Sequence, residues 1–183
     1  MEGLDAALGR LDADALARDV AALVQVPSVT GDERAALERL GELAEALGLR
    51  AELHRHDLEA LRALPDHPGE EGPRTELLGL TVAVPGARDD GPRLALDGHV
   101  DVVPPGTATW RHGSWAGVIE DGFVWGRGAV DMKGAVVAAL HALGALGDRA
   151  PHGEVVLLGS RPKRTAASGR SRRSSATAPS TRA

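Results

Sequence analysis

The chain has 183 residues, 43% hydrophobic and 26% charged, which is typical of one soluble globular domain. Its net charge of −5 argues against a nucleic-acid-binding protein, and we expect its apolar runs to be too short to span a membrane. The absence of cysteine excludes disulfides, thiol catalysis and thiolate metal sites. Aromatic residues make up only 2% of the chain, so the core is expected to consist of Leu, Val and Ala.

The N-terminal region is predicted to contain two amphipathic helices. The first runs from about Asp12 to Val24, and a Pro-Ser turn follows it. Thr30 and Glu33 have the spacing of a capping box for the second helix, which ends at Gly48. The first 20 residues have neither a basic region nor an apolar one, so no secretory signal is expected and the default location is the cytoplasm.

The middle of the chain is predicted to alternate strands with a helix. A short strand is expected at 49–53, and the β-type runs at 76–86 and 93–104 resemble neighbouring strands. Asp121-Gly122 lies between two apolar runs and predicts a tight hairpin. A helix over 132–146 and a strand over 154–158 complete the pattern, which favours an α/β layered sheet.

The composition changes abruptly at residue 161. Residues 161–183 carry seven Lys or Arg and no acid, which leaves 14 basic and 26 acidic residues, a net charge of −12, in residues 1–160. The tail contains no Leu, Ile, Val, Met, Phe or Trp, so we expect it to be disordered. The predicted organisation is therefore a folded part, 1–160, and a disordered basic tail, 161–183.

Two short motifs carry the candidate chemistry. Residues two apart share one face of a strand, so Asp97, His99 and Asp101 are expected to project together at a strand end. An imidazole beside a carboxylate is a common unit of metal sites, although a bare His-x-Asp is equally compatible with a structural hydrogen-bonded pair. Asp131 lies at a loop-to-helix junction, where a carboxylate can serve as a helix N-cap or bridge two metal ions.

The two motifs together resemble a known family. GHVDVVPPG (98–106), GSWAGVIEDGFVWGRGAVDMKGAVVAALHAL (113–143) and VQVPSVTGDE (24–33) resemble the zinc peptidase and amidohydrolase family. That family contains acetylornithine deacetylase, succinyl-diaminopimelate desuccinylase, aminoacylase-1 and the glutamate carboxypeptidases. The resemblance covers approximately residues 12–160. It implies an incomplete three-layer α/β catalytic domain with a mixed, mostly parallel sheet, and a lid or dimerisation domain that is absent.

The resemblance also implies roles for individual residues. His99 corresponds to a metal ligand, Asp131 to the carboxylate that bridges both ions, and Asp101 to the catalytic-site aspartate that supports His99 and the general base. The implied cofactor is Zn²⁺, two per intact site, with Co²⁺ as an alternative. Lys133, Trp110 and Trp115 receive structural or substrate-side roles, and the remaining histidines are expected at the surface or in the core.

Family members continue after the 154–158 strand with a Glu-Glu pair that supplies the general base and a ligand, and this chain has no such pair there. Codons 161–169, read one base out of frame, can encode Ser-Glu-Glu-Asp-Gly-Gly-Leu-Gly if the codon bases that the protein sequence leaves undetermined are chosen accordingly. We therefore interpret the tail as an out-of-frame translation, against the alternative of an ordinary basic tail. The chain as written is then expected to be inactive.

The predicted function of the intact parent is metal-dependent hydrolysis of amide bonds in N-acyl amino acids, in amino-acid metabolism such as arginine biosynthesis. A dipeptidase or carboxypeptidase of the same family is one alternative, and a non-catalytic metal-binding fragment is another. The expected partners are a small N-acyl amino acid or peptide and, for the parent, a second copy. Neither nucleic acid nor membrane is expected.

Overall fold

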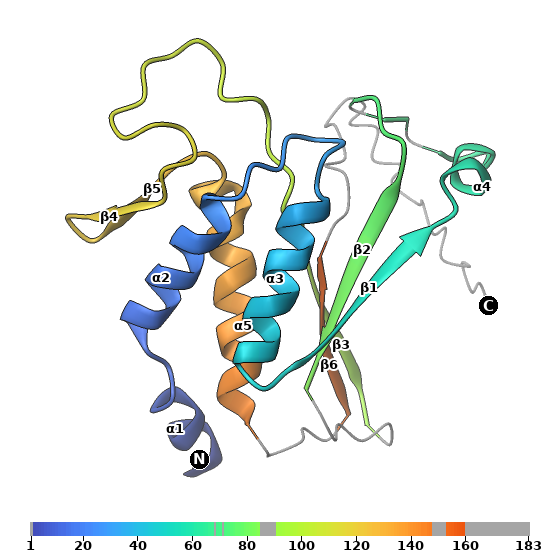
Figure 1. Ribbon diagram of the computed structural model, residues 1–183. Helices are drawn as coiled ribbons and strands as arrows, with labels where there is room; N and C mark the ends of the chain where they lie inside the picture. Colours follow the sequence, from blue (N-terminus) through green and yellow to red (C-terminus); the bar gives the residue numbers. More distant parts are fainter. Residues whose placement is uncertain (1, 68, 71, 85–90, 148–152, 160–183) are drawn as a thin grey trace, which may run out of the picture.

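A computed structural model describes residues 2–67, 69–70, 72–84, 91–147 and 153–159, and shows helices packed on one face of a β-sheet (Figure 1). The helices are α1 (Glu2–Leu8), α2 (Ala13–Val24), α3 (Arg34–Ala46), α4 (Leu58–Arg62) and α5 (Gly134–Leu146). The strands are β1 (Arg50–His56), β2 (Leu77–Ala83), β3 (Arg93–Gly98), β4 (Val118–Glu120), β5 (Phe123–Trp125) and β6 (Glu154–Gly159). The predicted α/β class is confirmed, whereas the tail at 161–183 lies outside the described residues.

The main sheet has the strand order β1-β2-β6-β3. The prediction that the 76–86 and 93–104 runs are neighbouring strands is wrong, because β6 lies between β2 and β3. The chain leaves β3, passes through α5 and returns as β6 parallel to β3, with Ala95 opposite Val156. A parallel neighbour requires such a crossover, and the returning strand takes the place beside β3 that a simple hairpin would have occupied.

The sheet is mixed, as predicted. Among the described strands, however, β1 pairs with β2 and β2 with β6 in antiparallel fashion, and only β3 and β6 are parallel. The expected excess of parallel pairs is therefore not found in this part of the sheet. Helices α3 and α5 contact one face of the sheet, and α2 packs outside them.

The two predicted N-terminal helices are confirmed, but their ends differ in detail. The side chain of Asp12 caps α2 by accepting hydrogen bonds from the backbone N–H groups of Asp14 and Ala15. The predicted capping box of Thr30 and Glu33 is wrong, since α3 begins at Arg34 and its N-cap residue makes no capping hydrogen bond. Glu33 instead accepts a hydrogen bond from the N–H of Gly31. The Thr30 hydroxyl is used elsewhere, as described below.

The hairpin predicted from Asp121-Gly122 is confirmed. Strands β4 and β5 pair with Val118 opposite Trp125, and the turn places Asp121 at φ 53° and Gly122 at φ 79°. Two consecutive residues with positive φ are the requirement of a two-residue turn whose twist matches the strands, which Asp-Gly satisfies at low cost.

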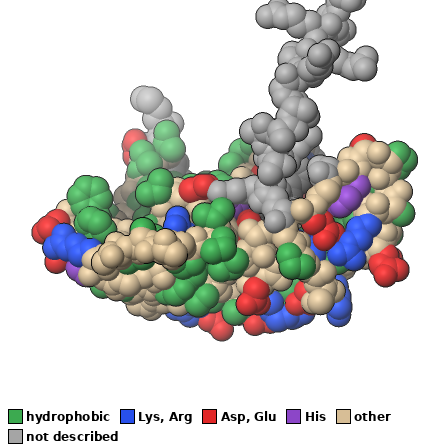
Figure 2. Space-filling model, turned by 90° about the horizontal axis from the view of Figure 1, so that it is seen from above, with side chains coloured by type: hydrophobic (Ala, Val, Ile, Leu, Met, Phe, Trp, Pro, Cys, Tyr) green, Lys and Arg blue, Asp and Glu red, His purple; other side chains and the backbone are tan. Residues whose placement is uncertain are grey.

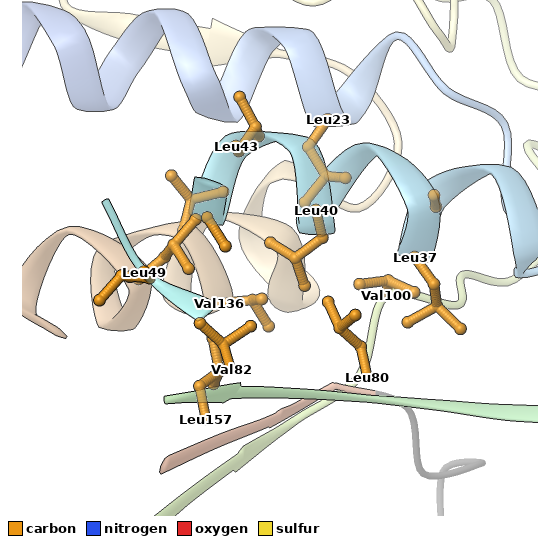
Figure 3. Close-up of a cluster of buried hydrophobic side chains, with 14 of the residues drawn as sticks. Leu23, Leu37, Leu40, Leu43, Leu49, Leu80, Val82, Val100, Val136 and Leu157 are labelled. Carbon is orange, nitrogen blue, oxygen red and sulfur yellow. The ribbon is translucent and has the colours of Figure 1, made fainter. Parts of the chain in front are cut away.

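The core between α3, α5 and the sheet is formed by Leu, Val and Ala side chains, as expected (Figure 3). Leu37 and Leu40 on α3 face Leu80 and Val82 on β2, and Val136 on α5 closes the cluster. Helix α5 with the turn before it, Ala129–Leu146, is long and apolar enough by length and composition to cross a membrane. The expectation of shorter apolar runs is thus wrong for this segment, which lies against the sheet because it is the central helix of the core.

Candidate metal centre

His99 and Asp101 follow directly after the carboxyl end of β3. Figure 1 shows loops gathered at this end of the sheet. The Nδ1 atom of His99 is 3.0 Å from the backbone oxygen of Asp101 and 3.2 Å from its carboxylate oxygen Oδ1. Both atoms are acceptors and so favour a proton on Nδ1; with the proton there, the Nε2 lone pair would be available to a metal ion. The Asp101 side chain is buried, at 3% exposure, and the His99 side chain is partly buried, at 12%.

Asp97 does not share this location. Strand β3 ends at Gly98, so the strand alternation that would align Asp97 with His99 and Asp101 stops before His99. Asp97 lines a hollow of about 210 Å³ on the sheet face away from the helices, together with His54 and Thr81. The sequence therefore placed His99 and Asp101 correctly beside each other, and Asp97 in the wrong group.

Asp131 comes to the same end of the sheet from the kinked turn Ala129–Lys133 that precedes α5. Its backbone is extended, at φ −128° and ψ 95°, and its peptide bond to Met132 is cis. The alternative role as the N-cap of the helix is excluded, because α5 begins at Gly134 and Lys133 occupies the cap position. The Oδ1 atom of Asp131 instead lies 3.3 Å from Nε2 of His99, and the carboxylate is 64% exposed.

The separation of these two donor atoms fits a shared metal ion. Two ligands bound to one tetrahedral Zn²⁺ at about 2.0–2.1 Å are themselves about 3.3–3.4 Å apart. His99 Nε2 and Asp131 Oδ1 match that value, and one nitrogen with one carboxylate is a donor set that zinc accepts. Among the residues that the structure describes, however, no group of three or more His, Asp or Glu is placed to hold a metal ion.

Glycine and lysine hold the Asp131 turn in place. Gly128 has φ +83°, and a Cβ atom there would lie 2.5 Å from Cγ1 of Val102, so the turn can approach the His99–Asp101 segment only with glycine at this position. Lys133 is fully buried, and its Nζ donates hydrogen bonds to the carbonyl oxygens of Leu23 at 3.0 Å and Val26 at 2.8 Å. Burial lowers the pKa of Lys133 to about 8. The structural role predicted for Lys133 is consistent with these contacts.

Thr30 is a residue of the site that the sequence interpretation missed. Its hydroxyl donates to Oδ2 of Asp101 at 2.8 Å, across 71 positions of the chain. Its spacing to Glu33 indicated a capping box, and no local pattern pointed to Asp101. The sequence feature that could have indicated this role is the position of Thr30 within VPSVTGDE, one of the segments that carry the family resemblance.

A hollow of about 220 Å³ lies directly beside Asp131 and is lined by Val102, Val103, Gly126, Arg127, Gly128, Val130 and Asp131. Figure 2 looks down on this edge of the molecule, where hydrophobic side chains are interspersed with charged ones. Arg127 donates to the carbonyl oxygen of Pro105 at 3.3 Å and stacks over the ring of Trp110 at 4.9 Å. The site therefore has open space on its Asp131 side.

Several of the other histidines have contacts away from this centre. His112 pairs with Glu120 on the hairpin at 3.0 Å, and His141 pairs with Asp19 on α2 at 2.8 Å. His54 lies 3.1 Å from the hydroxyl of Thr81 on the sheet. These positions agree with the expected surface and core roles, and His152 lies outside the described residues.

Comparison with known proteins identifies a family whose model matches the segment that carries these residues. The family described as "Peptidase family M20/M25/M40" matches residues 95–160, the segment that contains His99, Asp101 and Asp131. The family resemblance inferred from the sequence is thereby confirmed, and the chain carries a peptidase M20 family domain segment.

Individual relatives agree with that assignment. A succinyl-diaminopimelate desuccinylase of Xanthobacter autotrophicus is 41% identical over 128 residues, which cover 69% of this chain and 30% of the relative. The chain thus spans about 30% of the length of the curated relatives that it matches. The crystal structure of an M20 family metallo-carboxypeptidase from Sulfolobus solfataricus superposes with a TM-score of 0.54 at 23% identity, covering 77% of this chain and 29% of that one. Human carnosine dipeptidase 1 gives a TM-score of 0.54 at 19% identity, covering 81% and 32%. These two structures share the fold.

Proposed function

We propose that this chain supplies the first part of the active site of a metal-dependent hydrolase that cleaves amide bonds in N-acyl amino acids. The observation that carries the proposal is the 3.3 Å approach of His99 Nε2 to Asp131 Oδ1, with Asp101 hydrogen-bonded behind His99. The relatives named succinyl-diaminopimelate desuccinylase favour a desuccinylase or deacetylase over other members of the family.

In this proposal each of the three residues has a distinct role. His99 would hold an ion through Nε2, and Asp131 would be the carboxylate shared between two ions. Asp101 keeps the His99 ring in place and takes part in positioning the general base. Bound zinc, or cobalt in its place, would polarise the amide carbonyl and lower the pKa of a water molecule. The exposed carboxylate of Asp131 and the hollow beside it leave room for substrate on that side.

We further propose that the chain as written has no significant hydrolase activity. The described part of the site contributes two donor atoms facing each other, and residues 161–183 contain no Asp, Glu or His that could add a ligand or a base. Proton transfer by a positioned base contributes about 10²–10⁴-fold to the rate, so its loss alone would be severe. Zinc-dependent turnover of succinyl-diaminopimelate or acetylornithine by the purified 183-residue chain would refute this proposal.

The tail at 161–183 is proposed to be an out-of-frame translation of the segment that carries the Glu-Glu pair. Determining the nucleotide sequence around codon 160 tests this directly, and absence of a Glu-Glu word in the alternative frame contradicts it. If that word is present, a frame-corrected protein should gain zinc-dependent hydrolase activity. Its substrate panel would then separate a deacylase from the dipeptidase or carboxypeptidase alternative. The proposed setting of that protein is a cytoplasmic homodimer.

A measurement of zinc binding by the 183-residue chain distinguishes two alternatives, a fragment that still binds metal and a fragment that no longer does. Isothermal titration with Zn²⁺ should give binding that is lost in His99→Ala and Asp131→Asn. His112→Ala is the matched control, because His112 faces Glu120 on the hairpin rather than the proposed centre. Equal zinc binding by the wild type and the His99→Ala variant would contradict the proposed centre.

A further inference from the structure

The segment between α2 and α3 lies alongside the residues that follow β3. The N–H of Val102 donates to the carbonyl oxygen of Ser28 at 2.9 Å, and the N–H of Thr30 donates to that of Val102 at 3.2 Å. These bonds form a parallel bridge between Val29 and Val102. The hydroxyl of Ser28 adds a buried hydrogen bond to the carbonyl oxygen of Val100 at 2.7 Å. Thr30 is therefore attached by its backbone to the segment that contains Asp101.

The side chain of Thr30 completes this attachment. A carboxylate is an acceptor only, so the Thr30 hydroxyl must direct its proton to Oδ2 of Asp101, at 2.8 Å. The other carboxylate oxygen, Oδ1, is 3.2 Å from Nδ1 of His99. The Asp101 carboxylate, 3% exposed, is thus held on one side by Thr30 and faces the His99 ring on the other.

The turn after Thr30 is fixed as well. Gly31 has φ +100°, and a Cβ atom there would lie 2.5 Å from the carbonyl oxygen of Pro73. Its N–H donates to Oε1 of Glu33 at 2.8 Å, and the same carboxylate oxygen pairs with the buried guanidinium of Arg74 at 3.3 Å. Thr30 therefore has a defined position before any ligand arrives, which is what a residue that orients another side chain needs.

We propose that Thr30 is a positioning residue of the metal centre, acting through Asp101 on His99. The torsion that turns a carboxylate about its last bond is soft, so Asp101 needs a second partner to keep Oδ1 directed at the His99 ring. The Thr30 hydroxyl is one such partner. By holding the carboxylate it favours the His99 tautomer with the proton on Nδ1, against the Asp131 carboxylate that faces Nε2 at 3.3 Å. The expected effect of Thr30 on zinc affinity rests on the proposed metal-binding function, whereas its expected effect on the His99 tautomer does not.

The test uses three variants of the full chain. Thr30→Val keeps the shape of the side chain and removes the hydroxyl, and Thr30→Ser keeps the hydroxyl. Thr81→Val is the matched control, because the Thr81 hydroxyl contacts a different histidine, His54, at 3.1 Å on the sheet. In a zinc titration we expect Thr30→Val to raise the dissociation constant about tenfold, the lower end of the range for partners behind metal ligands. Thr30→Ser should restore it, and Thr81→Val should leave it unchanged. An unchanged constant in Thr30→Val, or one that Thr30→Ser does not restore, overturns the inference.

A second measurement needs no metal. The ¹⁵N shifts of the His99 ring, assigned with a His99→Gln variant and recorded where the ring is neutral, report which nitrogen carries the proton. Acceptors face both ring nitrogens, with Asp101 on the Nδ1 side and Oδ1 of Asp131 3.3 Å from Nε2. We expect a larger fraction of the Nδ1–H form in the wild type and in Thr30→Ser than in Thr30→Val, where the proton shifts toward Nε2. If the wild type binds no zinc, the proposed metal centre fails and this measurement alone decides the role of Thr30. A purely structural role would lower the melting temperature of Thr30→Val without changing the tautomer, and that result overturns the inference.

Discussion

Gly128 offers a sharp test of how the Asp131 turn is held against the rest of the site. Gly128 and Gly122 have nearly the same backbone conformation, with φ of +83° and +79°. A Cβ atom at Gly122 would meet nothing within 4 Å, whereas one at Gly128 would lie 2.5 Å from Val102 Cγ1 and 3.4 Å from Lys133 Cδ. The pair therefore separates the backbone cost of alanine at positive φ from the cost of crowding.

The expected magnitudes follow from these contacts. Gly122→Ala should lower the free energy of unfolding by about 1–2 kcal/mol, the cost of the left-handed conformation for a residue with a Cβ atom. Gly128→Ala should add about 1–3 kcal/mol for the forced shift of packed neighbours, for a total of about 2–5 kcal/mol. Because small domains are stable by only about 5–15 kcal/mol, this is a large fraction of the total.

Urea unfolding of both variants and the wild type, followed by circular dichroism, measures the difference. Gly128→Ala should also weaken zinc binding. The added Cβ atom would push the turn that carries Asp131 away from Val102, and with it away from the neighbouring His99–Asp101 segment. Gly122→Ala, on the distant hairpin, should leave zinc binding unchanged. Equal destabilisation by the two substitutions would refute the close approach of Gly128 to Val102.

Two further predictions concern the fold. Asp12→Ala should lower the melting temperature at neutral pH, because it removes the cap of α2. The hydrogen bond from the N–H of Ala15 lowers the pKa of the Asp12 carboxyl in the folded state. The stabilisation by the cap is therefore fully present above about pH 3.9 and is lost as the pH falls through the lower pKa of the folded state. Thermal melts of both proteins at pH 7 and under acid conditions check this, and a difference that persists unchanged in acid would contradict it. Leu40→Ala should lower the free energy of unfolding by about 2–5 kcal/mol, since Leu40 is fully buried between α3 and the sheet, whereas Leu8→Ala, at a side chain that is 54% exposed, should change it little in the same urea assay.

Much of the local structure could be predicted from the sequence, because it depends on short-range patterns. The apolar spacing of α2 and α3 and the Asp-Gly turn between β4 and β5 are properties of neighbouring residues. His99 and Asp101 are likewise two positions apart, so their proximity at the end of β3 was predictable. The resemblance of residues 98–134 to a peptidase family then joined Asp131 to them, and the match to residues 95–160 confirms that family.

The tertiary structure decided which distant segments meet. Strand β6 enters between β2 and β3 because of the α5 crossover, and no local pattern specifies that order. The spacing of Thr30 and Glu33 suggested a helix cap, but the long-range contact with Asp101 prevailed over the local one. The 3.3 Å approach of His99 to Asp131 depends on the turn at Gly128 packing against Val102. Residue types and short spacings thus determined the elements and the candidate ligands, whereas their convergence at one end of the sheet required packing between residues up to 110 positions apart.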